Sequence, residues 1–97
     1  MFVFEWDENK DKTNLVKHKI GFDEAKMVFD DPFLVTFSDD FHSSEEERLI
    51  SIGLSNHSRI LLIVHTEVSK QTDDIIIRII SCRKATALER EVYEQQE

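Results

Sequence analysis

Three polar side chains interrupt two apolar segments that have the composition of β-strands. His65 and Glu67 lie in the segment ILLIVHTE, and Arg78 lies in the β-branched run IIIRII. Because side chains alternate between the two faces of a strand, His65 and Glu67 are expected on the same face, about 7 Å apart. An arginine is costly to place in such a run unless its face meets a polar site. If the strands pair as a hairpin and the register permits, Arg78 lies beside His65 or Glu67.

An imidazole, a carboxylate and a guanidinium on one sheet face suit the cleavage of RNA by transesterification. That reaction needs a base for the 2′-hydroxyl, an acid for the departing 5′-oxygen and cations for the charge on phosphorus. We expect His65 to exchange a proton near neutral pH, with Glu67 as base or as the group that orients the imidazole. Arg78 and Arg83 are the expected phosphate ligands. The alternative is an ordinary cross-strand ion pair on a solvated face, which the spacing alone does not exclude.

Three further side chains are candidates for binding RNA. Lys84 follows Arg83 at the point where the last strand ends and a helix begins, although both side chains could equally be solvent-exposed cations at the start of that helix. Arg48 shares its expected strand face with Ile50 and could join the cluster across the sheet. Tyr93 lies on the last helix and could reach the cluster from there.

The other reactive side chains favour structural interpretations. His18 lies near a helix end, where a hydrogen-bonding role is the more common one. Cys82 is the only cysteine, so an internal disulfide and a cysteine metal cluster are both excluded. Asp39, Asp40 and His42 have the ingredients of a metal site, but no second histidine stands at a ligand spacing. We therefore expect no metal and no cofactor.

Length and composition indicate one small domain spanning residues 1–97. The chain is 40% hydrophobic, which suits a single core. No apolar run approaches the roughly 18 residues of a membrane span, and the first residues do not form a secretory leader. We expect a cytoplasmic protein with no membrane partner.

The net charge of −8 is unevenly distributed along the chain. Residues 1–47 hold 13 Asp and Glu against 5 Lys and no Arg, whereas residues 48–97 hold 7 of each sign and all five arginines. Stable duplex binding through phosphates needs clustered cations, so direct stable DNA binding is not expected. An acidic surface instead fits a basic protein partner, or an enzyme whose small cationic patch contacts its substrate briefly.

Hydrophobic periodicity predicts an α+β fold with the order β-α-α-β-β-β-β-α. A short strand at residues 2–6 precedes a helix capped by Asp7, and a second helix runs from Gly21 to Asp31. Strands are expected near residues 33–38, 48–55, 60–68 and 74–82. Thr86 and Glu89 form a capping box for the last helix, whose Leu88 and Val92 are expected to dock on the sheet.

Several segments together resemble the BrnT family of type II toxins, and they span nearly the whole chain. They are FEWDENKDKTNLVKHKIGFDEAKMVFDD, EEERLISIGLS, HTE and IRIISCRKATALEREVYE. The resemblance implies a RelE-like fold with a small antiparallel sheet, two N-terminal helices and one C-terminal helix. It also implies a ribonuclease that arrests translation and a BrnA-type antitoxin that neutralises it and supplies DNA binding. The polar residues matched by position are Trp6, Asp7, Asn14, Lys17, His18, Glu47, Arg48, His65, Glu67, Arg78, Arg83, Lys84, Glu89 and Tyr93.

Two functional hypotheses follow for this chain. The first is a metal-independent endoribonuclease toxin in which His65, Glu67, Arg78 and Arg83 cleave RNA bound by Arg48, Lys84 and Tyr93. The second is a toxin-like protein-binding module with weakened catalysis, which acts mainly by assembling with the antitoxin. Many relatives carry an arginine after the T-E pair, whereas this chain has Val68. That departure favours the second hypothesis.

Overall fold

The chain forms five strands and three helices in the order β-α-α-β-β-β-β-α in a computed structural model that describes residues 1–39 and 47–95. The predicted α+β class and element order are confirmed. The strands are β1 (Phe2–Glu5), β2 (Val35–Ser38), β3 (Leu49–Leu54), β4 (Ile60–Ser69) and β5 (Ile75–Lys84). The helices are α1 (Glu8–His18), α2 (Phe22–Met27), which continues into a short 3₁₀ turn at Val28–Asp30, and α3 (Ala87–Glu94).

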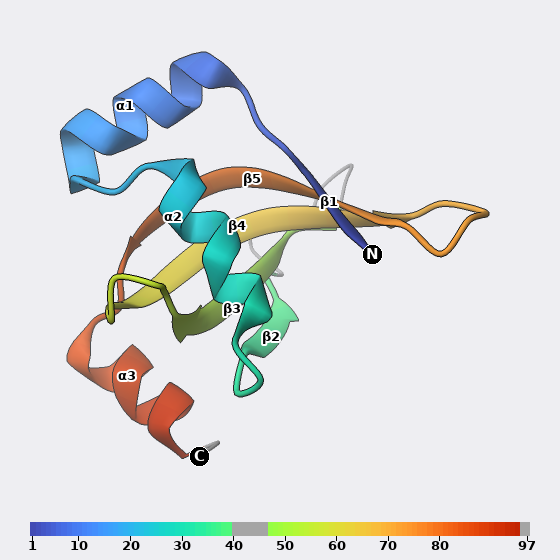
Figure 1. Ribbon diagram of the computed structural model, residues 1–97. Helices are drawn as coiled ribbons and strands as arrows, with labels where there is room; N and C mark the ends of the chain where they lie inside the picture. The colour runs from blue at the N-terminus through green and yellow to red at the C-terminus, as the bar shows by residue number, and fades with distance from the viewer. Residues whose placement is uncertain (40–46, 96–97) are drawn as a thin grey trace.

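The strands form one sheet in the order β1-β5-β4-β3-β2, with the long β4–β5 hairpin near its centre (Figure 1). Neighbouring strands are antiparallel except for β1, which pairs in parallel with the first half of β5. The sheet is therefore mixed and not wholly antiparallel. The parallel pair forms because α1 and the rest of the chain separate the two strands in sequence.

One face of the sheet, which we call the helix face, is covered by α2 and the 3₁₀ turn, while α1 lies along the edge of β5 (Figure 1). Alternate residues of β4 and β5 meet apolar side chains of α2 and the 3₁₀ turn there. The fully buried members of this cluster are Ile20, Phe22, Ala25, Val28, Leu61, Ile63 and Ile77. Burial of each large apolar side chain contributes about 1.5–3 kcal/mol, so this face is the main source of stability.

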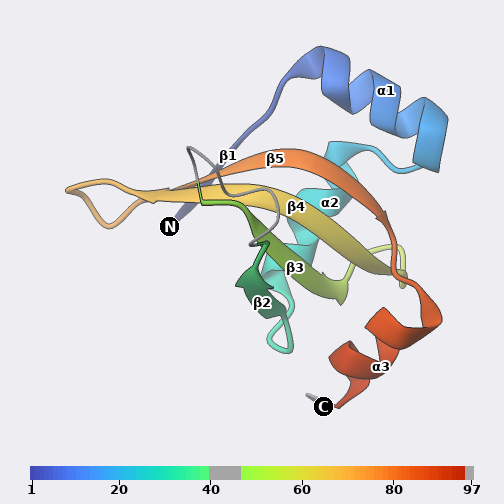
Figure 2. The same ribbon diagram turned by 180° about the vertical axis from the view of Figure 1, so that it is seen from behind.

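On the opposite face, which we call the groove face, α3 packs at one end of the sheet (Figure 2). Tyr93 is buried there against Ile52 and Leu62. The prediction that Leu88 and Val92 dock on the sheet is wrong, because their side chains are 73% and 41% exposed. Helical periodicity predicted an apolar stripe through Leu88 and Val92. The helix packs instead through the next residue, Tyr93, whose large ring is buried.

A partly buried carboxylate holds α3 in this position. Asp31 accepts hydrogen bonds from the Tyr93 hydroxyl at 2.6 Å and from the backbone amide of Leu54 at 2.8 Å. Burial raises the pKa of Asp31, but these hydrogen bonds outweigh burial and leave the pKa below its usual value. The C-terminal helix is thus fastened to the turn after α2, a segment far away in sequence.

The second half of β5 extends past β1, and α1 takes the place of a strand along it. The side-chain oxygen of Asn14 accepts the backbone N–H of Cys82 at 3.1 Å, and its amide nitrogen donates to the Ile20 carbonyl at 2.8 Å. Asn14 is 6% exposed and supplies a partner that an edge strand would otherwise lack. This contact fixes the distance between α1 and β5, on which the functional site depends.

Candidate functional site

A groove of about 550 Å³ lies on the groove face where α1, β5 and α3 meet the sheet. Apolar side chains of the strands form its floor, among them Ile50, Leu62 and Val64. Its polar residues come from α1 (Lys17 and His18), from β5 (Ser81 and Arg83), from α3 (Glu89) and from the position after β2 (Asp39). We call this hollow the sheet groove.

An irregularity in the hairpin determines which side chains reach the sheet groove. Val64 pairs with Ser81, but the next residue, His65, pairs with Ile79, so β5 holds one extra residue, Ile80. Such a bulge reverses the alternation of faces beyond it. Arg78 before the bulge and Arg83 after it therefore lie on the same face, while Cys82 turns into the core. In a regular strand, Arg83 would lie on the opposite face from Arg78.

Arg83 is held at the rim of the sheet groove by Glu89. Its two terminal nitrogens donate to the two carboxylate oxygens at 2.7 and 2.9 Å. This ion pair lowers the pKa of Glu89 to about 2 and raises the pKa of Arg83 further. Glu89 also accepts the Thr86 backbone N–H at 2.8 Å, which completes the predicted capping box. The guanidinium is therefore oriented, charged and still 40% exposed.

His18 is the histidine that the structure brings to the sheet groove. It is the last residue of α1, because Lys19 adopts a left-handed conformation with φ of 62° and closes the helix onto the Leu15 carbonyl. His18 is partly exposed, and it lines the groove with Lys17 opposite the β5 residues. Residue type alone favoured a structural role for His18. Its position next to the helix end at a strand edge was the available signal for a functional one.

His65 lies in the core instead. Its side chain is 0% exposed on the helix face, and its ring packs edge-on against Phe29 with centroids 5.0 Å apart. The Nε2 atom hydrogen bonds with the Ser51 hydroxyl at 2.7 Å, and burial lowers the pKa of His65 to about 4. An imidazole in this environment is neutral at physiological pH and does not reach RNA in this structure.

The predicted meeting of His65, Glu67 and Arg78 on one face is wrong. Arg78 pairs with Thr66, so it lies on the face opposite that of His65 and Glu67. Glu67 is exposed near the hairpin tip, beyond the buried part of the helix face. Arg78 forms a half-exposed ion pair with Glu5 at 3.6 Å, in register with the neighbouring strand. The bulge at Ile80 does not affect this part of the hairpin, so the register alone separates the three side chains.

The three predicted RNA-binding residues are also dispersed. Lys84 pairs with Leu61 at the end of β5, which places it on the helix-face side, away from Arg83. Tyr93 is 2% exposed and its hydroxyl is bound to Asp31, so the expected contact with RNA is contradicted by burial. Arg48 precedes β3, and strand alternation places it with Ile50 on the groove face. The groove face therefore holds Arg48, Arg78 and Arg83.

Neither a metal centre nor a membrane segment is found in the part of the chain that the structure describes. No three His, Cys, Asp or Glu side chains gather there as metal ligands, while Asp40 and His42 lie outside the described residues. Within residues 1–39 and 47–95, no helix is long and apolar enough to cross a membrane.

Comparisons with known proteins agree with this architecture. The family model for the ribonuclease toxin, BrnT, of type II toxin-antitoxin systems matches residues 6–89. The fold is similar to the crystal structure of the ribonuclease toxin BrnT from Brucella abortus, with a TM-score of 0.61 and 25% sequence identity. That similarity covers 89% of this chain and 97% of the Brucella chain. No curated protein matches this chain. The segment matched by the family model includes the polar residues of the sheet groove from Lys17 to Glu89.

Proposed function

We propose that this chain is an endoribonuclease that cuts RNA in the sheet groove and arrests translation. The chain belongs to the BrnT family of ribonuclease toxins of type II toxin-antitoxin systems. The observation that carries this proposal is the position of Arg83. Its guanidinium is held bidentately by Glu89 at the rim of a groove that Lys17 and His18 also line. A fixed cation and an imidazole that line one groove are groups that cleavage of a phosphodiester uses.

His18 is the proposed proton acceptor in this reaction. The imidazole takes the proton of the RNA 2′-hydroxyl, and the resulting oxygen attacks the adjacent phosphorus. The bond from phosphorus to the 5′-oxygen then breaks, and the departing oxygen takes a proton from Lys17. The products are a 2′,3′-cyclic phosphate and a free 5′-hydroxyl, so the chemistry balances with the protein's own side chains.

Arg83 is proposed to stabilise the negative charge on the phosphate during cleavage. Charge on the phosphoryl oxygens increases in the transition state, and a guanidinium already held in place stabilises it without reorganisation. Arg78 and Arg48 lie on the same face and are proposed to contact neighbouring phosphates of the RNA chain. The substrate therefore follows the groove face of the sheet.

The partner of this enzyme is proposed to be a BrnA-type antitoxin. Type II systems neutralise the toxin with a protein, and the net charge of −8 suits a partner with basic segments. DNA binding for autorepression is assigned to that antitoxin. The toxin itself lacks the positive charge that stable duplex binding requires.

Cleavage of a mixed-sequence RNA by the purified chain tests this proposal, with Arg83→Ala compared with Arg90→Ala. Both substitutions remove one arginine, but Arg90 is exposed on α3 and does not line the sheet groove. We expect Arg83→Ala to lower the cleavage rate by about 100-fold or more and Arg90→Ala to leave it within about twofold. Circular dichroism and urea unfolding check that both variants fold.

Two outcomes would contradict the proposal. Equal rates for both folded variants would remove Arg83 from the site. A folded native chain that cuts no RNA, on or off the ribosome, yet binds its antitoxin tightly would instead support the protein-binding module with weakened catalysis.

A further inference from the structure

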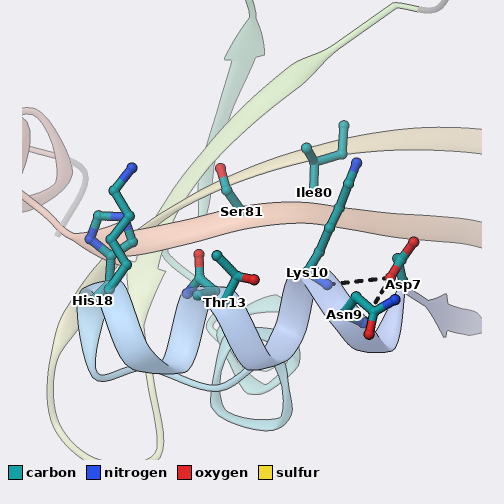
Figure 3. Close-up of a pocket in the computed structure, with 9 residues that line it drawn as sticks. Asp7, Asn9, Lys10, Thr13, His18, Ile80 and Ser81 are labelled. Atoms are coloured by element: carbon teal, nitrogen blue, oxygen red, sulfur yellow. Dashed lines mark hydrogen bonds between the residues drawn. The ribbon is translucent and has the colours of Figure 1, made fainter.

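A second hollow opens beside the sheet groove, between α1 and the bulged part of β5 (Figure 3). Its volume is about 370 Å³, which lies within the range of small-molecule sites. Asp7, Lys10, Thr13, Ile80 and Ser81 line it, and we call it the α1 pocket. The two hollows have Lys17, His18 and Ser81 in common, so they are adjacent.

The bulge and the helix together explain why the α1 pocket exists. Lys10, Thr13 and Lys17 recur at helical spacing, so they share the side of α1 that faces β5, as Figure 3 shows for the first two. Ile80 has no partner in β4, and it lines the pocket together with Ser81 from the bulged part of β5, where their side chains point the same way as that of Lys10 (Figure 3). Asn14 fixes the separation of helix and strand through its bonds to Cys82. The pocket is thus held open by buried contacts.

The chemistry of the lining combines an apolar wall with hydrogen-bonding edges. Ile80 offers an apolar surface, while Thr13 and Ser81 offer hydroxyl groups that donate and accept. Asp7 caps α1 by accepting the backbone N–H groups of Asn9 and Lys10, and both bonds go to Oδ1. Among the residues that the structure describes, no hydrogen-bond donor contacts the second oxygen, Oδ2. That oxygen is available to accept a hydrogen bond from a ligand.

We propose that the α1 pocket is a nucleobase-recognition subsite, which receives the base of a nucleotide next to the bond cut in the sheet groove. This inference rests on the proposed function of that groove. A base is planar and partly apolar, with donors and acceptors only on its edges, which matches the wall and rim of the pocket. Lys10 and Lys17 line the pocket and supply positive charge for the sugar-phosphate chain as it passes into the groove.

The free carboxylate oxygen of Asp7 predicts which bases fit. Adenine, cytosine and guanine each carry an exocyclic amino group that can donate to a carboxylate, whereas the donor of uracil is its ring N3–H, which lies between two carbonyl oxygens that repel a carboxylate. A hydrogen bond to a charged group is strong enough to favour the three amino bases over uracil by about tenfold. The subsite therefore discriminates against uridine.

Binding of single nucleotides tests this subsite independently of cleavage. The four nucleoside 3′-monophosphates are titrated separately into the native chain, and amide shifts are followed by nuclear magnetic resonance. We expect shifts at Thr13, Ile80 and Ser81, with uridine 3′-monophosphate binding about tenfold more weakly than the other three. Shifts absent from these residues, or confined to the far side of the sheet groove, would overturn the proposal.

Asp7→Asn is the matched variant, because asparagine caps a helix as well as aspartate does. Glu8→Gln is its control, because it removes the same charge from the neighbouring residue, which does not line the pocket. We expect Asp7→Asn to abolish the tenfold discrimination and Glu8→Gln to retain it. Unchanged discrimination in folded Asp7→Asn would refute the assignment of this oxygen.

Cleavage-site mapping separates this inference from the function on which it rests. A native chain that cuts RNA with no base preference next to the cut would refute the subsite and leave the ribonuclease intact. A native chain that binds nucleotides as predicted but cuts nothing would support the subsite and refute the proposed catalysis. Variants that lose only antitoxin binding would mean that the α1 pocket contacts protein, which also overturns the inference.

Discussion

The two faces of the sheet carry similar residue types in opposite environments. On the helix face, His65 is enclosed by Phe29 and Ser51 and has no exposed surface. On the groove face, His18 and Arg83 line a hollow that α3 borders through Glu89. An ionisable side chain on the closed face is restricted to its neutral form, whereas one on the open face can exchange protons and bind anions. The face on which a residue lies therefore determines its chemistry.

Substitution of the two histidines tests this comparison most directly and has the largest expected effect. We expect His18→Gln to lower the cleavage rate by about 100-fold or more, because it removes the proposed base, and to change stability by at most about 0.5 kcal/mol. His57→Gln is the control, because His57 is also exposed but lies in the β3–β4 turn away from the sheet groove. Cleavage rates and urea unfolding measure the two effects.

His65→Gln should show the reverse pattern, with lower stability and a nearly unchanged cleavage rate. An unchanged rate in His18→Gln, together with inactivity in a stable His65→Gln, would reverse the assignment of roles to the two faces.

The pH dependence of stability is the next largest effect. The pKa of His65 is about 4 in the folded chain and about 6.5 when it is unfolded, so the unfolded state binds the proton more strongly. Stability is therefore complete above pH 6.5 and falls as the pH decreases toward 4. Between pH 7 and pH 5 we expect a loss of about 2 kcal/mol, measured by urea unfolding.

This interval lies mostly above the range in which carboxylates titrate, so Glu89 and Asp31 contribute little to it. Glu89 has a pKa of about 2 in the folded chain, and its contribution disappears only at lower pH. Stability that does not change between pH 7 and pH 5 would mean that His65 is not enclosed as described.

The attachment of α3 gives the smallest effect and tests which side of that helix packs on the groove face. Tyr93→Phe retains the ring and removes the hydroxyl that donates to Asp31, which should cost about 1 kcal/mol. Leu88→Ala removes more apolar surface, but from an exposed side chain, so its effect should stay within about 0.5 kcal/mol. Thermal unfolding compares the two. A larger loss of stability in Leu88→Ala than in Tyr93→Phe would mean that α3 packs on the sheet through the side of the helix that carries Leu88.

Local patterns in the sequence predicted the elements well because their causes are local. Asp7 and Thr86 cap the helices as expected, since each side chain bonds to amides within three residues. The β4 and β5 runs form the predicted hairpin because their β-branched residues suit paired strands. The order of elements followed from these signals and from the turn residues between them.

The positions of the candidate site residues depend on strand register and tertiary contacts, which no local sequence pattern contains. Alternation along a strand correctly placed His65 and Glu67 on one face, but it could not supply the register that separates Arg78 from them. The extra residue at Ile80 has no distinctive composition, because it continues an isoleucine-rich run. The use of Asn14 as a partner for the edge of β5 depends on a contact across 68 residues, which is a tertiary feature.

The unpaired Ile80 also determines how this strand responds to changes in length. Loss of Ile80 would remove the bulge and leave Ser81 to Lys84 paired with the same residues of β4, so their faces would not change. Loss of a second residue between Arg78 and Arg83 would instead exchange the faces of the positions that follow. The guanidinium of Arg83 would then enter the apolar core, where an unpaired charge is very costly. The strand therefore tolerates the loss of one residue at this point but not the loss of two.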